Sequence, residues 1–267
     1  MTALLRTEGI TKSYGGVQAL NGANLAVEAG TVAGLIGPNG SGKTTLFNVI
    51  TGYERPDTGQ VLFQDRAITG LAPDKVFAAG VGRTFQLSRI FPRLTVIENM
   101  LVAAQASERP KNLLAWLGRG AWVQQRRHAL ELLAFVGIER HADVLAGSLS
   151  YGQRKLLELA YVLVADPAVI LLDEPAGGVN PTLINMIADR IKQLNAERGK
   201  TFLLVEHNME FVMGLCSAIT VLESGATVVS GPPDIVRTDK RVLDAYLGAD
   251  LDDDDLEAEP VFKESGR

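Results

Sequence analysis

A glycine-rich loop near the start of the chain has the composition and spacing of a phosphate-binding loop. Residues 37–44 follow the pattern glycine, four residues, then Gly-Lys-Thr. The glycines let backbone N–H groups turn inward around phosphate oxygens, and the N-terminus of a following helix adds positive potential. The lysine reaches the β- and γ-phosphates, and the threonine hydroxyl is a ligand for Mg²⁺. The pattern predicts a nucleoside triphosphate site formed by Gly37, Pro38, Asn39, Gly40, Ser41, Gly42, Lys43, Thr44 and Thr45.

Two carboxylates follow an apolar run in the second half of the chain. Residues 169–172 read Val-Ile-Leu-Leu, and Asp173 and Glu174 come directly after them. The end of a buried strand tolerates such charges only where they are paired or used in chemistry. Asp173 suits a ligand of Mg²⁺, and Glu174, which points elsewhere, suits the group that orients or deprotonates an attacking water molecule. The alternative is that these carboxylates form a structural ion pair at the strand end. The presence of a phosphate-binding loop in the same chain favours the catalytic interpretation.

These residues need a sheet that brings strand ends together. Short runs rich in Val, Ile and Leu are typical of parallel strands covered on both faces, and they occur at residues 32–36, 169–172, 201–205 and 218–222. Helical patterns follow at residues 43–50, 153–165 and 182–198. This alternation predicts an α/β fold with a doubly wound, mostly parallel sheet.

Two other parts of the chain depart from this alternation. Roughly the first 30 residues, and residues 58–65, alternate between polar and apolar positions and predict a small antiparallel sheet. Residues 88–160 lack strand patterns, whereas residues 96–106 and 124–136 have helical spacing. We therefore expect a helical insertion between the phosphate loop and the acidic pair.

The charge of the chain is unevenly distributed. The net charge is −5 over 267 residues, yet residues 249–267 hold eight acidic and two basic residues, so the remainder carries only +1. The acidic tail is expected to be solvated and disordered. Because residues 1–248 carry a net charge of only +1 and show no cluster of basic residues, a nucleic-acid partner is not expected. The single cysteine, Cys216, excludes an internal disulfide, and no apolar run approaches the roughly 18 residues that a membrane span needs.

A second anion site is predicted further along the chain. Residues 149–153 read Leu-Ser-Tyr-Gly-Gln, and a serine followed three residues later by a glutamine makes a capping box at a helix start. An exposed helix N-terminus with a serine hydroxyl and a glycine backbone attracts phosphate. This second site comprises Ser150, Tyr151, Gly152 and Gln153. Together with the phosphate loop and the acidic pair, it makes residues 4–247 resemble an ATP-binding-cassette (ABC) ATPase.

The resemblance implies a fold and a division of the chain. It implies a P-loop, RecA-like sheet with an antiparallel β subdomain and an inserted α-helical subdomain. Residues 1–248 would form the nucleotide-binding domain, with the insertion at about residues 88–160, and residues 249–267 the acidic tail. In this family the signature serine of one subunit faces the nucleotide of the other, so two subunits enclose two ATP molecules.

The resemblance also implies roles for single residues. Tyr14 resembles the aromatic residue that stacks on adenine, and Gln86 the loop glutamine that contacts Mg²⁺ or water. His207 resembles the histidine that contacts the γ-phosphate and holds the water. The expected sets are, for catalysis, Lys43, Glu174 and His207 and, for Mg²⁺, Thr44, Gln86 and Asp173.

Two positions depart from the general family pattern. Tyr151 stands where glycine is usual, and Asn180, in a loop expected between subunits, stands where aspartate is common. Asparagine keeps an acceptor but loses the charge. Both departures resemble the branch that imports branched-chain amino acids, as do residues 95–99, 205–209 and 245–248.

This branch implies the ATP-hydrolysing subunit of an importer for branched-chain or other hydrophobic amino acids, with ATP and Mg²⁺ as its cofactors. It would lie peripherally at the cytoplasmic face of the cell (inner) membrane. The expected partners are two multi-spanning permeases, a second ABC ATPase of the same or a related sequence and, indirectly, a solute-binding protein. The alternatives are an ATPase for urea or amide uptake, one for lipid export, and a non-transport ABC ATPase. A GTPase is disfavoured because the guanine-reading Asn-Lys-x-Asp pattern is absent.

Overall fold

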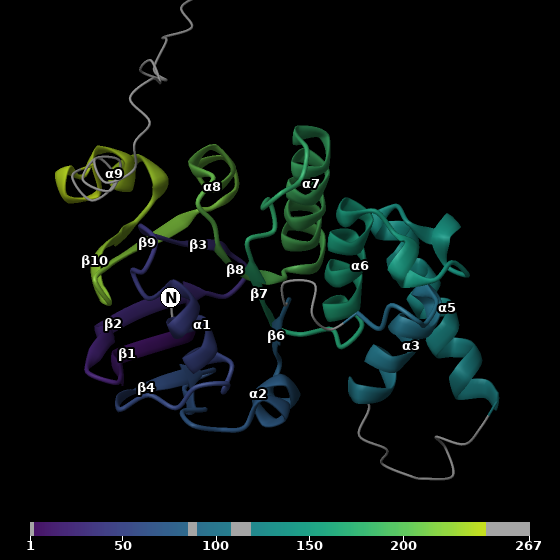
Figure 1. The fold of residues 1–267 in the computed structure, drawn as a ribbon, viewed down its shortest axis with the longest axis horizontal. Coiled ribbons are helices and arrows are strands. Elements are labelled where there is room, and N and C mark those ends of the chain that lie inside the picture. The colour runs from purple at the N-terminus through teal and green to yellow at the C-terminus, as the bar shows by residue number, and fades with distance from the viewer. Residues whose placement is uncertain (1–2, 85–89, 108–118, 244–267) are drawn as a thin grey trace, which may run out of the picture.

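The computed structural model describes residues 3–84, 90–107 and 119–243. Its central sheet comprises β3 (Val32–Ile36), β6 (Val81–Arg83), β7 (Val169–Asp173), β8 (Thr201–Val205), β9 (Ala218–Glu223) and β10 (Ala226–Gly231). The strand order is β10-β9-β3-β8-β7-β6 (Figure 1). The five strands from β9 to β6 in this order run parallel, and β10 pairs with β9 in the antiparallel direction.

A second sheet is antiparallel and comes mostly from the start of the chain. Its strands are β1 (Ala3–Tyr14), β2 (Val17–Glu28), β4 (Thr58–Phe63) and β5 (Arg66–Ala67), in the order β2-β1-β4-β5. It lies beside the β9 and β10 end of the central sheet in Figure 1, and β2 contacts β10. The small antiparallel sheet expected from the sequence is therefore confirmed.

The helices cover the central sheet and extend it on one side. They are α1 (Lys43–Ile50), α2 (Pro73–Ala79), α3 (Val96–Ser107), α5 (Arg119–Val136), α6 (Tyr151–Leu163), α7 (Pro181–Arg198), α8 (Met209–Leu215) and α9 (Pro233–Thr238). α3, α5 and α6 contact one another and form a helical group at the end of the molecule next to β6 (Figure 1). The helical insertion is thus present, although its predicted boundaries at residues 88 and 160 stay a prediction.

Two apolar clusters hold the central sheet, one on each face. Alternate residues of β8 divide between them: Phe202 and Leu204 belong to the cluster with the helices α6 to α8, and Leu203 and Val205 to the cluster with α1 and the antiparallel sheet. All four are at most 2% exposed. This division explains why the strands read as continuous apolar runs, since both faces are buried.

Most predicted elements are confirmed, and the differences have local causes. β3, β8 and α1 occupy their predicted ranges, and β7 and β9 end one residue later. α6 and α7 begin at Tyr151 and Pro181, before their predicted starts, because Ser150 and Asn180 cap them. The acidic tail at residues 249–267 lies outside the described residues.

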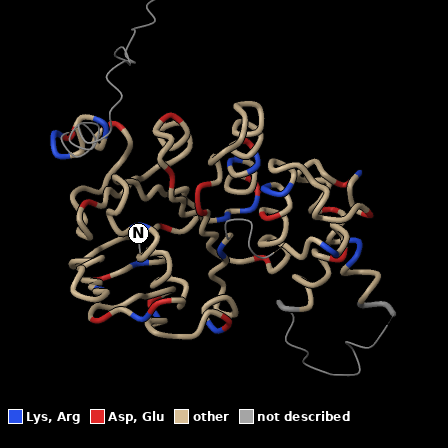
Figure 2. Tube along the Cα trace, in the orientation of Figure 1, with Lys and Arg blue, Asp and Glu red and all other residues tan. Residues whose placement is uncertain are grey.

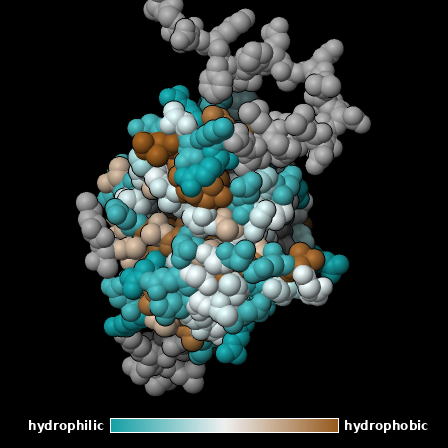
Figure 3. All heavy atoms as spheres, turned by 90° about the vertical axis from the view of Figure 1, so that its left-hand side faces the viewer, coloured by the Kyte–Doolittle hydropathy of each residue, from teal (hydrophilic) through white to brown (hydrophobic). Residues whose placement is uncertain are grey.

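The surface carries charges of both signs. Lys and Arg are interspersed with Asp and Glu over the part of the chain that the structure describes (Figure 2). Figure 3 shows a largely hydrophilic face with some exposed apolar side chains near its upper part, and Ile235 of α9 is 53% exposed. None of the described helices is long and apolar enough to cross a membrane. The expectation of no nucleic-acid partner stays a prediction.

Candidate active site

The phosphate loop lies between the end of β3 and the start of α1. Two of its glycines have no room for a side chain: a Cβ atom on Gly37 would lie 2.0 Å from the carbonyl oxygen of Leu222, and one on Gly42 would lie 2.5 Å from that of Ala19. Their φ angles are 151° and 99°, a region that side chains disfavour. Only glycine therefore allows the loop to stay against the elements that hold it.

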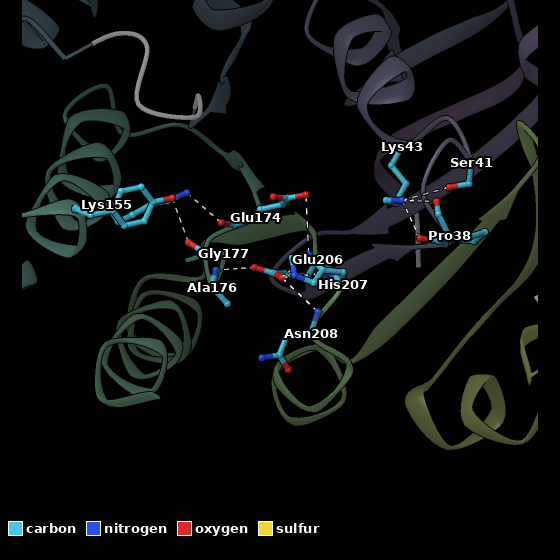
Figure 4. Close-up of polar contacts among 12 residues, drawn as sticks. Pro38, Ser41, Lys43, Lys155, Glu174, Ala176, Gly177, Glu206, His207 and Asn208 are labelled. Atoms are coloured by element: carbon cyan, nitrogen blue, oxygen red, sulfur yellow. Dashed lines mark hydrogen bonds and ion pairs between the residues drawn. The ribbon is translucent and has the colours of Figure 1, made fainter. Parts of the chain in front are cut away.

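Lys43 folds back over this loop. Its Nζ atom donates hydrogen bonds of 2.8 Å to the carbonyl oxygens of Gly37 and Pro38 (Figure 4). Burial lowers the pKa of Lys43, and the charge of Glu174 opposes this shift. No described side chain caps the start of α1, and its first turn holds no acidic residue. The helix N–H groups and the ammonium therefore both favour an anion here.

Asp173 ends β7 and is paired with Arg83. The Oδ2 atom of Asp173 accepts a hydrogen bond of 2.8 Å from Nη2 of Arg83, and the two side chains are only 10% and 6% exposed. Nη1 of Arg83 also donates to Oδ1 of Asn48 at 2.7 Å and to Oγ1 of Thr51 at 3.1 Å. The ion pair considered as the alternative for this strand end is therefore present, and it uses one carboxylate oxygen of Asp173. Sequence reasoning missed Arg83 because its three-residue strand carries no signal of a partner 90 residues away.

Glu174 follows in a left-handed backbone conformation with a φ angle of 46°. Residues other than glycine rarely adopt this conformation, and it persists only where surrounding contacts hold it. The N–H of Glu174 donates to the carbonyl oxygen of Val205 at 2.9 Å. Its Oε1 lies 4.0 Å from Nδ1 of His207 (Figure 4). These two side chains are 39% and 68% exposed, so water reaches both of them.

The first turns of α6 contact the loop that contains Glu174. Nζ of Lys155 donates to the carbonyl oxygen of Glu174 at 3.0 Å, and Oη of Tyr151 donates to that of Gly177 at 3.2 Å. Lys155 is 7% exposed, and its Nζ lies 5.9 Å from the ring centre of Tyr151. The tyrosine that departs from the family pattern thus binds a loop of its own chain. Sequence reasoning missed Lys155, since its partner is a backbone carbonyl in a distant segment.

The predicted capping box is confirmed at the start of α6. The N–H of Gln153 donates to Oγ of Ser150 at 3.3 Å, and the N–H of Ser150 donates to Oε1 of Gln153 at 2.9 Å. A Cβ atom on Gly152 would lie 2.4 Å from Cδ2 of Leu183, so the starts of α6 and α7 pack closely. Asn180 caps α7 through a hydrogen bond of 2.9 Å from the N–H of Leu183 to its Oδ1. An aspartate would accept the same bond, so asparagine suffices for the cap.

Tyr14 and Gln86 complete the predicted set. Tyr14 ends β1, is 42% exposed, and has Nζ of Lys12 at 5.2 Å from its ring centre. Burial raises the pKa of Tyr14, and the charge of Glu54 adds to the shift. An accessible aromatic face is what stacking on a base requires. Gln86 lies outside the described residues.

The topology explains how the central groups meet. β3, β8 and β7 are neighbours in the parallel sheet, so their carboxyl ends lie at one edge. The phosphate loop follows β3, His207 follows β8, and Asp173 and Glu174 lie at the end of β7. Figure 4 shows Glu174 and His207 between Lys43 on one side and Lys155 on the other. This edge places a helix N-terminus and an ammonium group beside a carboxylate and an imidazole, which are the kinds of group that phosphoryl transfer to water uses.

Fold and site together define a P-loop ATPase cassette, and the sequence model of the family described as ABC transporter matches residues 20–177. The chain therefore belongs to the ABC transporter family, and it is an ATP-binding cassette ATPase, as the resemblance predicted. Such an ATPase works with membrane permeases and dimerises.

The relatives and solved structures cover nearly the whole chain. It is 40% identical over 250 residues to the high-affinity branched-chain amino acid transport ATP-binding protein BraF of Pseudomonas aeruginosa, covering 92% of this chain and 98% of BraF. It is 36% identical over 249 residues to LivG of Escherichia coli K12, which has the same description, with coverages of 92% and 98%. The crystal structure of the ADP conformation of MJ1267, an ATP-binding cassette of an ABC transporter, matches with a TM-score of 0.81 and 35% identity, covering 93% of this chain and all of that one.

Proposed function

We propose that this chain is the ATP-hydrolysing subunit of an importer for branched-chain or other hydrophobic amino acids. The observation that carries the substrate class is the 40% identity to BraF over 98% of that protein, whose description is a branched-chain amino acid transport ATP-binding protein. The chain would act at the cytoplasmic face of the cell membrane. There it would bind two multi-spanning permeases and a second ATPase subunit, and a solute-binding protein would supply the specificity.

ATP binding is assigned to the phosphate loop and to Tyr14. Backbone N–H groups of the loop and Nζ of Lys43 bind the β- and γ-phosphates, and the ring of Tyr14 stacks on adenine. When ATP binds, the ammonium group of Lys43 would exchange its hydrogen bonds to the carbonyl oxygens of Gly37 and Pro38 for contacts with the phosphates. Residues 1–248 form the ATPase unit in this proposal, with the helical insertion at about residues 88–160 and an appended acidic tail.

Residues at the start of α1 and at the end of β7 fit Mg²⁺. The Thr44 hydroxyl and the Asp173 carboxylate are hard oxygen donors, and Gln86 would contribute a third. In the part of the chain that the structure describes, no three acidic, His or Cys side chains form a metal-binding group by themselves. This suits a Mg²⁺ ion that takes its remaining ligands from water and phosphate oxygens. When bound, the ion neutralises charge on the phosphates.

Hydrolysis is assigned to Glu174 and His207. The carboxylate of Glu174 orients the attacking water and accepts its proton, and the imidazole of His207 holds this water in line with the γ-phosphate. Lys43 stabilises the charge that develops on the transferred phosphoryl group. The 4.0 Å separation of Glu174 Oε1 and His207 Nδ1 supports a shared water molecule.

The second anion site is assigned to the dimer. Ser150, Tyr151, Gly152 and Gln153 at the start of α6 would contact the γ-phosphate held by the partner subunit, and Asn180 would lie in the loop between the subunits. ATP then joins two subunits, and hydrolysis releases them. This alternation between two states is what drives the permeases.

A paired variant tests the catalytic assignment. Glu174→Gln should retain ATP binding, lose turnover by at least about 100-fold and accumulate as a dimer in ATP. Glu28→Gln, which neutralises an exposed carboxylate at the end of β2, serves as the matched control with normal turnover. Dimers are measured by size-exclusion chromatography with light scattering. Turnover retained in Glu174→Gln would refute the assigned base.

Uptake measurements test the substrate class. The complete complex, reconstituted in vesicles with its permeases and solute-binding protein, should take up labelled leucine, isoleucine or valine when ATP is present on the cytoplasmic side. Uptake of urea or short amides alone would contradict the proposal in favour of the alternative importer. Co-purification with ribosomes instead of permeases would contradict transport altogether.

A further inference from the structure

Glu206 is a buried carboxylate that the assignments above do not use. It lies between the last residue of β8 and His207, and its exposure is 0%. Burial raises the pKa of Glu206, and the N–H of Ala176 and other backbone donors oppose that shift. A buried carboxylate destabilises a fold unless hydrogen bonds compensate for the lost water. Its partners therefore indicate what the residue does.

The partners of Glu206 are backbone N–H groups from two separate loops. Its Oε1 accepts a hydrogen bond of 2.5 Å from the N–H of Ala176, in the loop after β7. Its Oε2 accepts hydrogen bonds from the N–H of His207 at 3.2 Å and, at the longer distance of 3.5 Å, from that of Asn208, both in the loop after β8 (Figure 4). Each carboxylate oxygen thus serves a different loop.

These two loops carry the two groups that act on water. Glu174 lies two residues before Ala176, and His207 directly follows Glu206. One nitrogen of the His207 ring lies near both carboxylates, since Nδ1 is 4.0 Å from Oε1 of Glu174 and 4.0 Å from Oε2 of Glu206. The left-handed backbone of Glu174 also needs contacts that hold it in place. The loop between Glu174 and Gly177 receives them from α6 on one side and from Glu206 on the other.

We propose that Glu206 is a positioning residue for ATP hydrolysis, whose buried carboxylate holds the loop of Glu174 and the loop of His207 in one fixed arrangement. This proposal rests on the roles proposed above for Glu174 and His207. A carboxylate is suited to the task because both of its oxygens accept hydrogen bonds. Glutamine offers one acceptor and places an NH₂ group against the other loop, so it can hold only one of the two loops.

The test compares Glu206→Gln and Glu206→Ala in the full chain. The two loops lie at the ends of β7 and β8, whereas the phosphates are bound mainly by the loop after β3. Affinity and stoichiometry for a fluorescent ATP analogue should therefore stay within about threefold of the unaltered protein. Turnover should fall, by about 100-fold for alanine and by less for glutamine, because misplacing reacting groups by about 1 Å has such an effect.

Amide hydrogen exchange supplies a readout that does not depend on turnover. The N–H groups of Ala176 and His207 should exchange at least about tenfold faster in Glu206→Ala, because they lose their acceptor. Exchange of the N–H groups that are hydrogen-bonded within the sheet, in β7 and β8, should change little. A general loss of stability would instead raise exchange throughout the sheet.

Asn99→Ala is the matched control. Asn99 is also 0% exposed, and its partners among the described residues are backbone atoms, those of Phe91, Leu94 and Thr95. It should lose comparable stability while keeping turnover per bound nucleotide. Equal losses of turnover in Asn99→Ala and Glu206→Ala, or full turnover in Glu206→Ala, would overturn the proposal. If Glu206→Ala fails to fold, Glu206→Gln takes its place in this comparison. Full turnover in Glu206→Gln, or a loss of turnover equal to that in Asn99→Ala, would then overturn the proposal.

The outcome separates this proposal from the catalytic assignment. If Glu174→Gln retains turnover, the assigned base is wrong whatever Glu206 does. If Glu174→Gln is inactive and Glu206→Ala is fully active with unchanged exchange at Ala176 and His207, the catalytic assignment stands and the positioning role of Glu206 is refuted.

Discussion

Replacing Arg83 by methionine tests how the end of β7 is held together. Methionine keeps much of the side-chain volume but removes the charge that partners Asp173 and the hydrogen bonds to Asn48 and Thr51. The two charged side chains are 6% and 10% exposed, so the remaining carboxylate would be nearly buried without its cation. Breaking a buried pair in this way costs about 3–5 kcal/mol. A folded domain is typically stable by about 5–15 kcal/mol, so the loss should be conspicuous.

Equilibrium unfolding in urea measures this loss, and a double-mutant cycle isolates the pair. The variants are Arg83→Met, Asp173→Asn and the two combined. We expect the combined variant to be more stable than the sum of the single losses predicts, by at least about 1 kcal/mol. Arg127→Met is the matched control: the Arg127–Glu131 pair is 76% and 64% exposed, and such surface pairs contribute less than about 1 kcal/mol. An interaction energy below about 0.5 kcal/mol for Arg83 and Asp173 would refute the reasoning.

Four further predictions address the nucleotide site and the fold. Lys43→Ala should weaken binding of a fluorescent ATP analogue by at least about tenfold, since it removes a charge-assisted contact; unchanged affinity would argue against the phosphate loop. Ser150→Ala should lower the free energy of unfolding by about 1 kcal/mol through loss of the α6 cap, and an unshifted urea midpoint would contradict it. Chelation of Mg²⁺ should abolish ATP hydrolysis reversibly, and hydrolysis that continues in excess chelator would exclude the metal assignment. Burial raises the pKa of the Cys216 thiol to about 12, so a thiol reagent at pH 8 should label the folded chain on the order of a thousandfold more slowly than the chain in urea; equal rates would show that the thiol is accessible.

The features predicted correctly from the sequence are those with local causes. β3, the glycine-rich turn after it and α1 follow one another within 19 residues, so the glycine pattern and the apolar run together predicted this strand, turn and helix. The capping box at Ser150 was equally local, since both of its partners lie within three residues.

The features that escaped prediction depend on tertiary contacts. Arg83 reaches Asp173 only because β6 pairs with β7 in the folded chain, and the helical insertion separates these two strands in the sequence. Lys155 reads as an ordinary helix residue, and only the packing of α6 shows that it is buried against the carbonyl of Glu174. Glu206 lies in residues 205–209, which resemble the importer branch, but nothing in the neighbouring sequence predicted that its side chain would be fully buried. β10 was missed because its residues are only half-buried and lack an apolar run.

The link between α6 and the Glu174 loop has a consequence for how this ATPase can be altered. Tyr151 and Lys155 lie one helical turn apart, and both donate hydrogen bonds to the loop, so the position of α6 and that of the loop are coupled. α3 and α5 pack against the same helix. If Glu174 acts as proposed, a substitution in the interface of α3, α5 and α6 that displaces α6 should change the rate of ATP hydrolysis. On the proposed assignment, turnover would then change while the residues assigned to the nucleotide stay the same.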